Sequence, residues 1–131
     1  MSGTDLEPHQ VYLLQIMAQP ASVQIDQYDW DADQVPVGIT NFWMIAFTGW
    51  YRGQGKQPLP NLADDIIAID RMRAEASENG PEALWTNEAL RHDPFWEEMR
   101  HLATKALQTR GLSTTKPDPA KWYDVLPEEL H

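Results

Sequence analysis

Glu98 and His101 have the spacing that comes closest to a metal site in this chain. They stand within the run Glu98-Met-Arg-His101, so a helix would place the carboxylate and the imidazole on one face. Di-iron carboxylate bundles use this Glu-x-x-His spacing, but they need it twice, with two further glutamates from facing helices. The two further glutamates on facing helices cannot be identified from the spacing of the sequence. We therefore expect no bound metal or other cofactor, with Glu98 and His101 kept as candidate ligands and an exposed polar helix face as the alternative.

Asp29, Asp31 and Asp33 alternate in the way that opens a calcium-binding loop. An EF-hand also needs glycine at the sixth loop position and a bidentate glutamate at the twelfth. Gln34 and Thr40 occupy those positions here. The pattern therefore favours an acidic surface, which either contacts a basic partner or is solvated.

Other catalytic patterns are missing from the sequence. The chain has no cysteine, and its four serines lie outside any nucleophile-elbow setting. The glycine-rich run at 53–56 departs from the phosphate-binding consensus, because Trp50 and Gln57 replace the required residues. Two carboxylates brought together by folding would leave no sequence signature. The sequence leaves enzymatic activity open but favours a chain that is not catalytic on its own.

The net charge of the chain limits the kinds of partner that it can bind. The net charge is −10, and residues 1–51 carry six acids and no lysine or arginine. A polyanion would be repelled, so we expect no direct nucleic-acid binding. The uncharged segment 34–51 is shorter than the roughly 20 apolar residues of a membrane span and includes proline and glycine. Without cysteines or a recognisable secretory signal, the expected location is the cytoplasm.

The same uncharged segment is expected to form the centre of the fold. Thr40 or Asn41 suits an N-cap, and Gly53 suits a helix end, which predicts an apolar helix at about 42–52. A helix that is apolar nearly all round has to be covered by its neighbours. The predicted fold is therefore mainly α, a small domain of about four to five helices around this one.

The other helices are predicted from end signals and periodicity. They cover about 8–19, 62–78, 82–91 and 94–110, and residues 22–28 are expected to form an extended connection. The helix at 94–110 has the clearest ends, with Asp93 as N-cap, Pro94 in the first turn and Gly111 after the last. Residues 1–112 then form a single helical domain.

Residues 113–131 are predicted to form an extended C-terminal arm with a short apolar motif. The motif includes Trp122, Tyr123, Leu126 and Leu130 on a polar, proline-containing tether. Such a motif can dock on another protein subunit, on a second copy of the chain, or back onto its own core.

Three functions remain open from the sequence. The favoured one is a non-catalytic protein–protein interaction protein, an accessory or structural subunit of a larger assembly, in which the arm and the acids Asp29, Asp31 and Asp33 contact the partner. The second is an acidic inhibitor that occupies a basic nucleic-acid-binding surface of another protein. The third is a small enzyme or metal-binding protein that uses Glu98 and His101.

Overall fold

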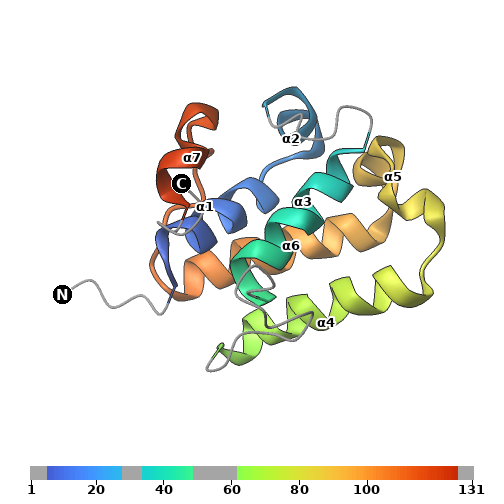
Figure 1. Cartoon of the computed structure of the whole chain (residues 1–131), viewed down its shortest axis with the longest axis horizontal. Coiled ribbons are helices and arrows are strands. Elements are labelled where there is room, and N and C mark those ends of the chain that lie inside the picture. The colour runs from blue at the N-terminus through green and yellow to red at the C-terminus, as the bar shows by residue number, and fades with distance from the viewer. Residues whose placement is uncertain (1–5, 28–33, 49–61, 127–131) are drawn as a thin grey trace.

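All regular structure in the described residues is helical, as predicted. The computed structural model describes residues 6–27, 34–48 and 62–126, with only the backbone for Trp122 (Figure 1). These residues form seven α-helices: α1 Pro8–Met17, α2 Ala21–Gln27, α3 Val35–Trp43, α4 Asp64–Asn79, α5 Asn87–His92, α6 Pro94–Thr109 and α7 Trp122–Val125. A π-helical turn, η1 (Met44–Thr48), continues α3, and two 3₁₀ turns, η3 (Glu82–Trp85) and η4 (Pro119–Lys121), precede α5 and α7.

Helix α1 is enclosed by its neighbours. It contacts α3, η1, α6 and α7, and even its polar residues His9 and Gln10 are buried. Gln10 holds two elements together, since its Oε1 accepts the Glu7 N–H at 2.8 Å and its Nε2 donates to the Ala46 carbonyl at 2.8 Å. The helix ends at Met17, two residues before the predicted end.

The central apolar segment is helical and buried, but it begins earlier than predicted. α3 starts at Val35, so Thr40 and Asn41 lie inside the helix and do not cap it. Asn87 from α5 takes over the capping function, because its Oδ1 accepts the Val35 N–H at 2.7 Å. Trp43 is 1% exposed and Phe47 0%, while the predicted end at residue 52 lies outside the described residues.

The prediction of an extended connection over residues 22–28 was wrong, because residues 21–27 form α2. The carbonyl of Pro20 accepts the N–H groups of Val23 and Gln24 and so starts the helix. The Gln24 side chain then turns back, and its Nε2 donates to the carbonyls of Ile16 and Met17 at the end of α1. The short alternation of apolar and polar residues did not distinguish this helix from a strand.

The chain between α4 and α6 contains two elements where one was predicted. Thr86 separates η3 from α5, and its Oγ1 caps α5 by accepting the Ala89 N–H at 3.2 Å. α4 begins after Ala63, and Asn61, the predicted N-cap, lies outside the described residues.

Helix α6 has the predicted ends. Asp93 Oδ1 accepts the Phe95 N–H at 2.9 Å, and Gly111 adopts φ 69°. The Leu112 N–H reaches the Leu107 carbonyl at 2.9 Å, which completes a Schellman end. The buried face is rotated slightly from the predicted one: Trp96, Met99, Ala103 and Ala106 are buried, whereas Phe95 and Leu102 are half-buried.

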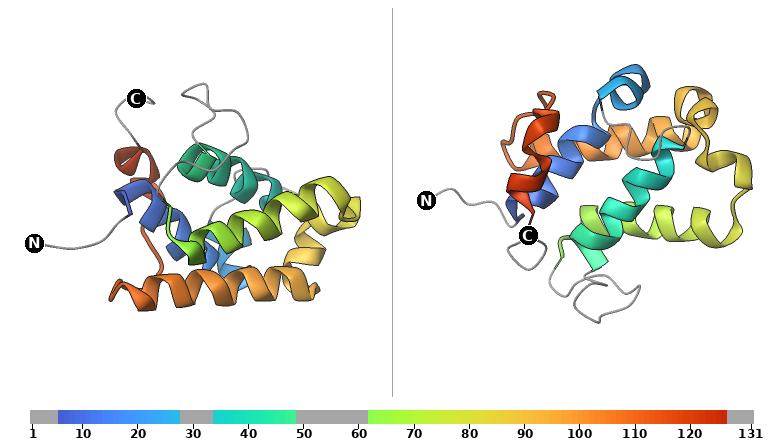
Figure 2. Two further views of the ribbon diagram at one scale, coloured as in Figure 1. Left: turned by 90° about the horizontal axis from the view of Figure 1, so that it is seen from below. Right: turned by 45° about the horizontal axis from the view of Figure 1, so that its top comes forward.

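Helix α6 also organises the rest of the molecule, since α1, α4 and α5 all contact it. α3 packs on α1 and α5 (Figure 2). The buried side chains of α1, α3, η1, α4 and α6 form one core. None of the described helices is both long and apolar enough to cross a bilayer.

Candidate functional site

The described part of the C-terminal arm, residues 113–126, lies against α1. Three side chains of α1 and its C-terminal turn hold backbone carbonyls of the arm. Gln15 Nε2 donates to Ser113 O at 3.0 Å, Gln19 Nε2 to Thr114 O at 2.9 Å, and the Tyr12 hydroxyl to Asp118 O at 2.6 Å. These contacts fix the path of the arm, and α7 then packs on α1.

The predicted arm motif is divided by this packing. Leu126 is half-buried against the core together with Val125, whereas Tyr123 is 46% exposed. Tyr123 is the most exposed large hydrophobic side chain among the described residues. The Trp122 side chain and Leu130 lie outside the described part of the chain.

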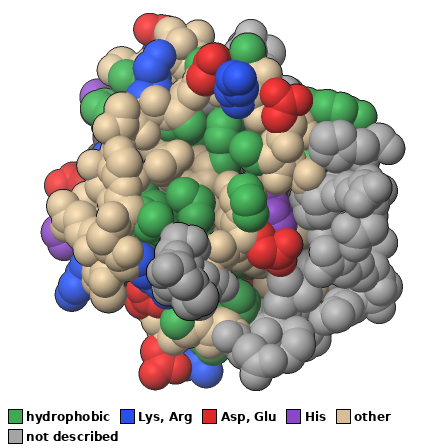
Figure 3. Space-filling model, turned by 90° about the vertical axis from the view of Figure 1, so that its left-hand side faces the viewer, with side chains coloured by type: hydrophobic (Ala, Val, Ile, Leu, Met, Phe, Trp, Pro, Cys, Tyr) green, Lys and Arg blue, Asp and Glu red, His purple; other side chains and the backbone are tan. Residues whose placement is uncertain are grey.

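The end of the molecule that carries α7 and the start of α1 is partly apolar. Figure 3 shows this face, and apolar side chains gather near its centre while charged ones stand mostly around them. Tyr123 lies on α7 and is 46% exposed, and an exposed tyrosine can add a large contact area to an interface with little conformational freedom to lose.

Glu98 and His101 are both exposed on α6 and line a surface hollow of about 450 Å³. Arg100 stands between them and lines it too. The Arg100 guanidinium donates to the carbonyls of Gln19 at 2.9 Å and Leu90 at 3.4 Å. Burial lowers the pKa of Arg100, and Glu97 partly opposes this shift.

No group of three potential metal-ligating side chains occurs among the described residues. Glu98 and His101 therefore gain no third ligand in this part of the chain, and the neighbouring guanidinium disfavours a second cation. The acids Asp29, Asp31 and Asp33 lie outside the described residues, and the nearby Asp26 is exposed at the end of α2.

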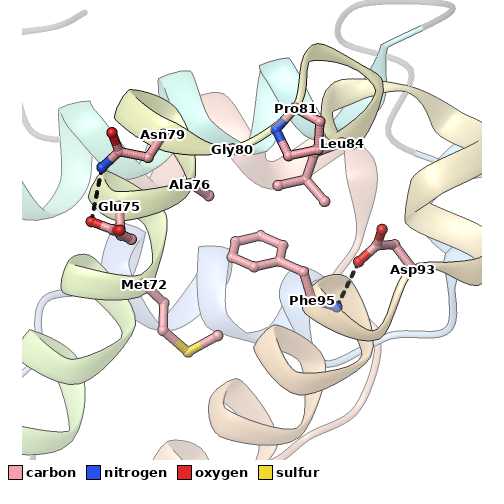
Figure 4. A pocket seen from close by; sticks show the side chains of 9 residues that line it. All are labelled: Met72, Glu75, Ala76, Asn79, Gly80, Pro81, Leu84, Asp93 and Phe95. Atoms are coloured by element: carbon pink, nitrogen blue, oxygen red, sulfur yellow. Dashed lines mark hydrogen bonds between the residues drawn. The ribbon is translucent and has the colours of Figure 1, made fainter.

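A surface groove that the sequence did not predict lies between α4, η3 and the start of α6 (Figure 4). This apolar groove has a volume of about 400 Å³ and is lined by Met72, Glu75, Ala76, Asn79, Gly80, Pro81, Leu84, Asp93 and Phe95. Periodicity places Phe95 on a core-facing stripe but does not show that its neighbours leave it half covered. Three separate segments build the groove, so only the tertiary structure reveals it.

A buried polar network also joins α3 to α4. Asp70 Oδ1 accepts the Trp43 indole N–H at 2.7 Å and the Arg73 guanidinium at 3.1 Å. Asp70 is 4% and Arg73 6% exposed. Because solvent has little access, we assign the network to the architecture and not to a reaction.

Comparison with known proteins gives no further assignment, since no family model, curated protein or solved structure matches the chain.

Proposed function

We propose that the protein is a non-catalytic interaction protein, an accessory or structural subunit of a larger cytoplasmic assembly. Its partner is another protein subunit or a second copy of the chain, bound at the end face formed by α7 and the start of α1. The exposure of Tyr123 is the observation that carries this proposal. Tyr123 also belongs to the apolar motif that the sequence predicts as a partner-binding segment.

The way in which the arm is held supports this role. Its backbone carbonyls are bound by side chains of the buried helix α1, so Tyr123 stands on a fixed support. A binding residue held in place before association loses less conformational entropy when the partner arrives. Leu126 is half-buried and packs against the core, so it supports α7 while part of its side chain stays exposed.

Native mass spectrometry of the tagged full-length chain, isolated from the source cell, tests the proposal. We expect a stoichiometric complex with wild-type protein. The Tyr123→Ala variant should weaken the complex about 30-fold, because a central aromatic anchor contributes about 2 kcal/mol or more. Tyr123→Phe keeps the ring and should largely retain the complex, which makes it the matched control.

The free energy of unfolding of each variant is measured together with its binding. Tyr123 is 46% exposed, so the alanine variant should lose about 1–2 kcal/mol in the free energy of unfolding and remain folded. A strictly monomeric wild-type chain, or a complex that survives Tyr123→Ala unchanged, would reject the proposed function.

A further inference from the structure

The apolar groove has a floor of apolar side chains and walls from three elements. Figure 4 shows the Phe95 ring near its centre, with Leu84 and Ala76 directed toward the ring and Met72 beside it. Phe95 and Met72 are half-buried, so part of each side chain remains open to a ligand. A partner that covers them removes apolar surface from water, which is worth about 25 cal/mol per Å².

Contacts between the elements that form the groove fix its shape. The Trp96 indole N–H donates to the Leu84 carbonyl at 2.7 Å and ties η3 to α6. The Phe95 ring meets Trp96 edge-on, with 4.9 Å between the ring centroids. The Gly80 N–H closes the end of α4 on the Ala76 carbonyl at 2.9 Å. The surface is therefore formed before a ligand arrives, which lowers the cost of binding.

The charges at the groove are all of one sign. Glu75 and Asp93 line it, toward opposite ends in the view of Figure 4, and no lysine, arginine or histidine is among the lining residues. Asn79 Nδ2 donates to Glu75 Oε2 at 3.1 Å, and the Phe95 N–H donates to Asp93 Oδ1 at 2.9 Å. The second oxygen of each carboxylate, Glu75 Oε1 and Asp93 Oδ2, accepts no hydrogen bond from the described residues.

The shape of the groove indicates the kind of occupant. It is open to solvent and is not an enclosed cavity. Small molecules are usually surrounded over most of their surface, which an open groove cannot provide, whereas a peptide needs only one face covered. Symmetric pairing of two such grooves is disfavoured, because it would bring Glu75 and Asp93 of one chain against the same acids of the other.

The geometry points to a second binding site in which the apolar groove takes a basic amphipathic segment of a partner protein. A bulky apolar side chain of that segment packs on Phe95 and Met72, and lysine or arginine side chains on either side pair with Glu75 and Asp93. This site lies on α4, η3 and α6, so it is distinct from the surface around Tyr123.

A display library of random linear peptides, selected on the immobilised full-length protein, tests the inference. The Glu75→Gln/Asp93→Asn double variant serves for counter-selection. We expect the enriched peptides to share an aromatic or large aliphatic residue flanked by lysine or arginine. Nuclear magnetic resonance of the complex should place the largest shifts at Met72, Gly80 and Phe95.

The affinity of each variant for a selected peptide then distinguishes binding in the groove from attraction to the overall negative charge of the protein. Asparagine at position 93 remains a good N-cap, so Asp93→Asn removes the charge without removing the helix start. The groove double variant should bind about five- to tenfold more weakly, since two exposed charge pairs contribute up to about 1 kcal/mol each. The matched control, Glu78→Gln/Glu82→Gln, changes the net charge equally at exposed acids that do not line the groove, and should leave affinity within about twofold.

Several results would overturn the inference. One is enrichment of no peptide, or of peptides without basic residues. Another is equal weakening by the groove and control variants, which would show attraction to the acidic surface as a whole. A concentration-dependent dimer that Phe95→Ala abolishes would assign the groove to a second copy instead.

Discussion

At the scale of single residues, the buried carboxylate of Asp70 decides how α3 and α4 fit together. Its Oδ1 receives the Trp43 indole at 2.7 Å and the Arg73 Nε and guanidinium nitrogen at 3.3 and 3.1 Å. A buried ion pair gains little overall, but removal of one partner leaves an uncompensated charge. Helical periodicity does not reveal that Trp43 of another helix reaches Asp70.

Substitution of Asp70 by alanine should therefore destabilise the fold strongly. We expect a loss of about 3–5 kcal/mol in the free energy of unfolding, since Arg73 stays buried without its anion. Urea unfolding followed by circular dichroism measures this. Glu78→Gln, an exposed change on the same helix, should stay within about 0.5 kcal/mol of wild type.

The double variant Asp70→Leu/Arg73→Met distinguishes the contribution of the two buried charges to stability from the contribution of side-chain packing. It removes both charges together and should recover much of the loss, although the Trp43 N–H then lacks its acceptor at a cost of about 1–3 kcal/mol. If Asp70→Ala alone matched Glu78→Gln, the network would have no role in stability.

At the scale of elements, the ends of the helices show why some were predictable. Asp93 and Gly111 flank α6 and Pro94 is its first residue, so all three act on the helix locally and the sequence pattern was sufficient to predict its ends. α3 starts earlier because its cap, Asn87, comes from another helix. α2 was missed because Gln24 gains its partners from the end of α1. Capping from distant residues leaves no signal at the helix itself.

The two glycines at helix ends should respond differently to substitution. Gly111 has φ 69° and open space where a Cβ would stand, whereas a Cβ at Gly80 would lie 2.6 Å from the Ala76 carbonyl oxygen. Gly111→Ala should cost about 1–2 kcal/mol, because an alanine is strained in the left-handed conformation. Gly111→Asn should cost less, since asparagine tolerates that conformation.

Gly80 provides the contrast, because its cost arises from a contact and not from its conformation. Gly80→Asn should be no better than Gly80→Ala. Thermal unfolding of the four variants gives the comparison. Equal stability of Gly111→Ala and Gly111→Asn would show that the conformation at 111 is not what glycine provides.

At the scale of the whole molecule, the arm and the core depend on each other. The sequence named Tyr123 and left open where the arm docks, and the structure places residues 113–126 along α1. Neither that path nor the apolar groove follows from spacing along the chain, because each is built by segments that meet only in the folded protein. The mainly helical class did follow, since it depends on periodicity within each helix.

The last prediction concerns how firmly the arm is held. Tyr12→Phe keeps the ring, which stacks near Phe42 at a centroid distance of 6.5 Å, and removes the hydroxyl that donates to Asp118 O. A hydrogen bond of this kind contributes about 1 kcal/mol, so local opening of the arm should become about fivefold more frequent.

Amide hydrogen exchange at Ala120, Lys121 and Leu126 measures this opening, because their N–H groups are bonded within the arm. Amides in the middle of α6 serve as the internal control and should exchange as in wild type. Because the closed arm stays the main form, Tyr12→Phe should leave the affinity of the proposed complex nearly unchanged while exchange becomes faster. Binding weakened about fivefold would mean that the arm is already largely open in wild type, whereas unchanged exchange would show that Tyr12 does not hold the arm.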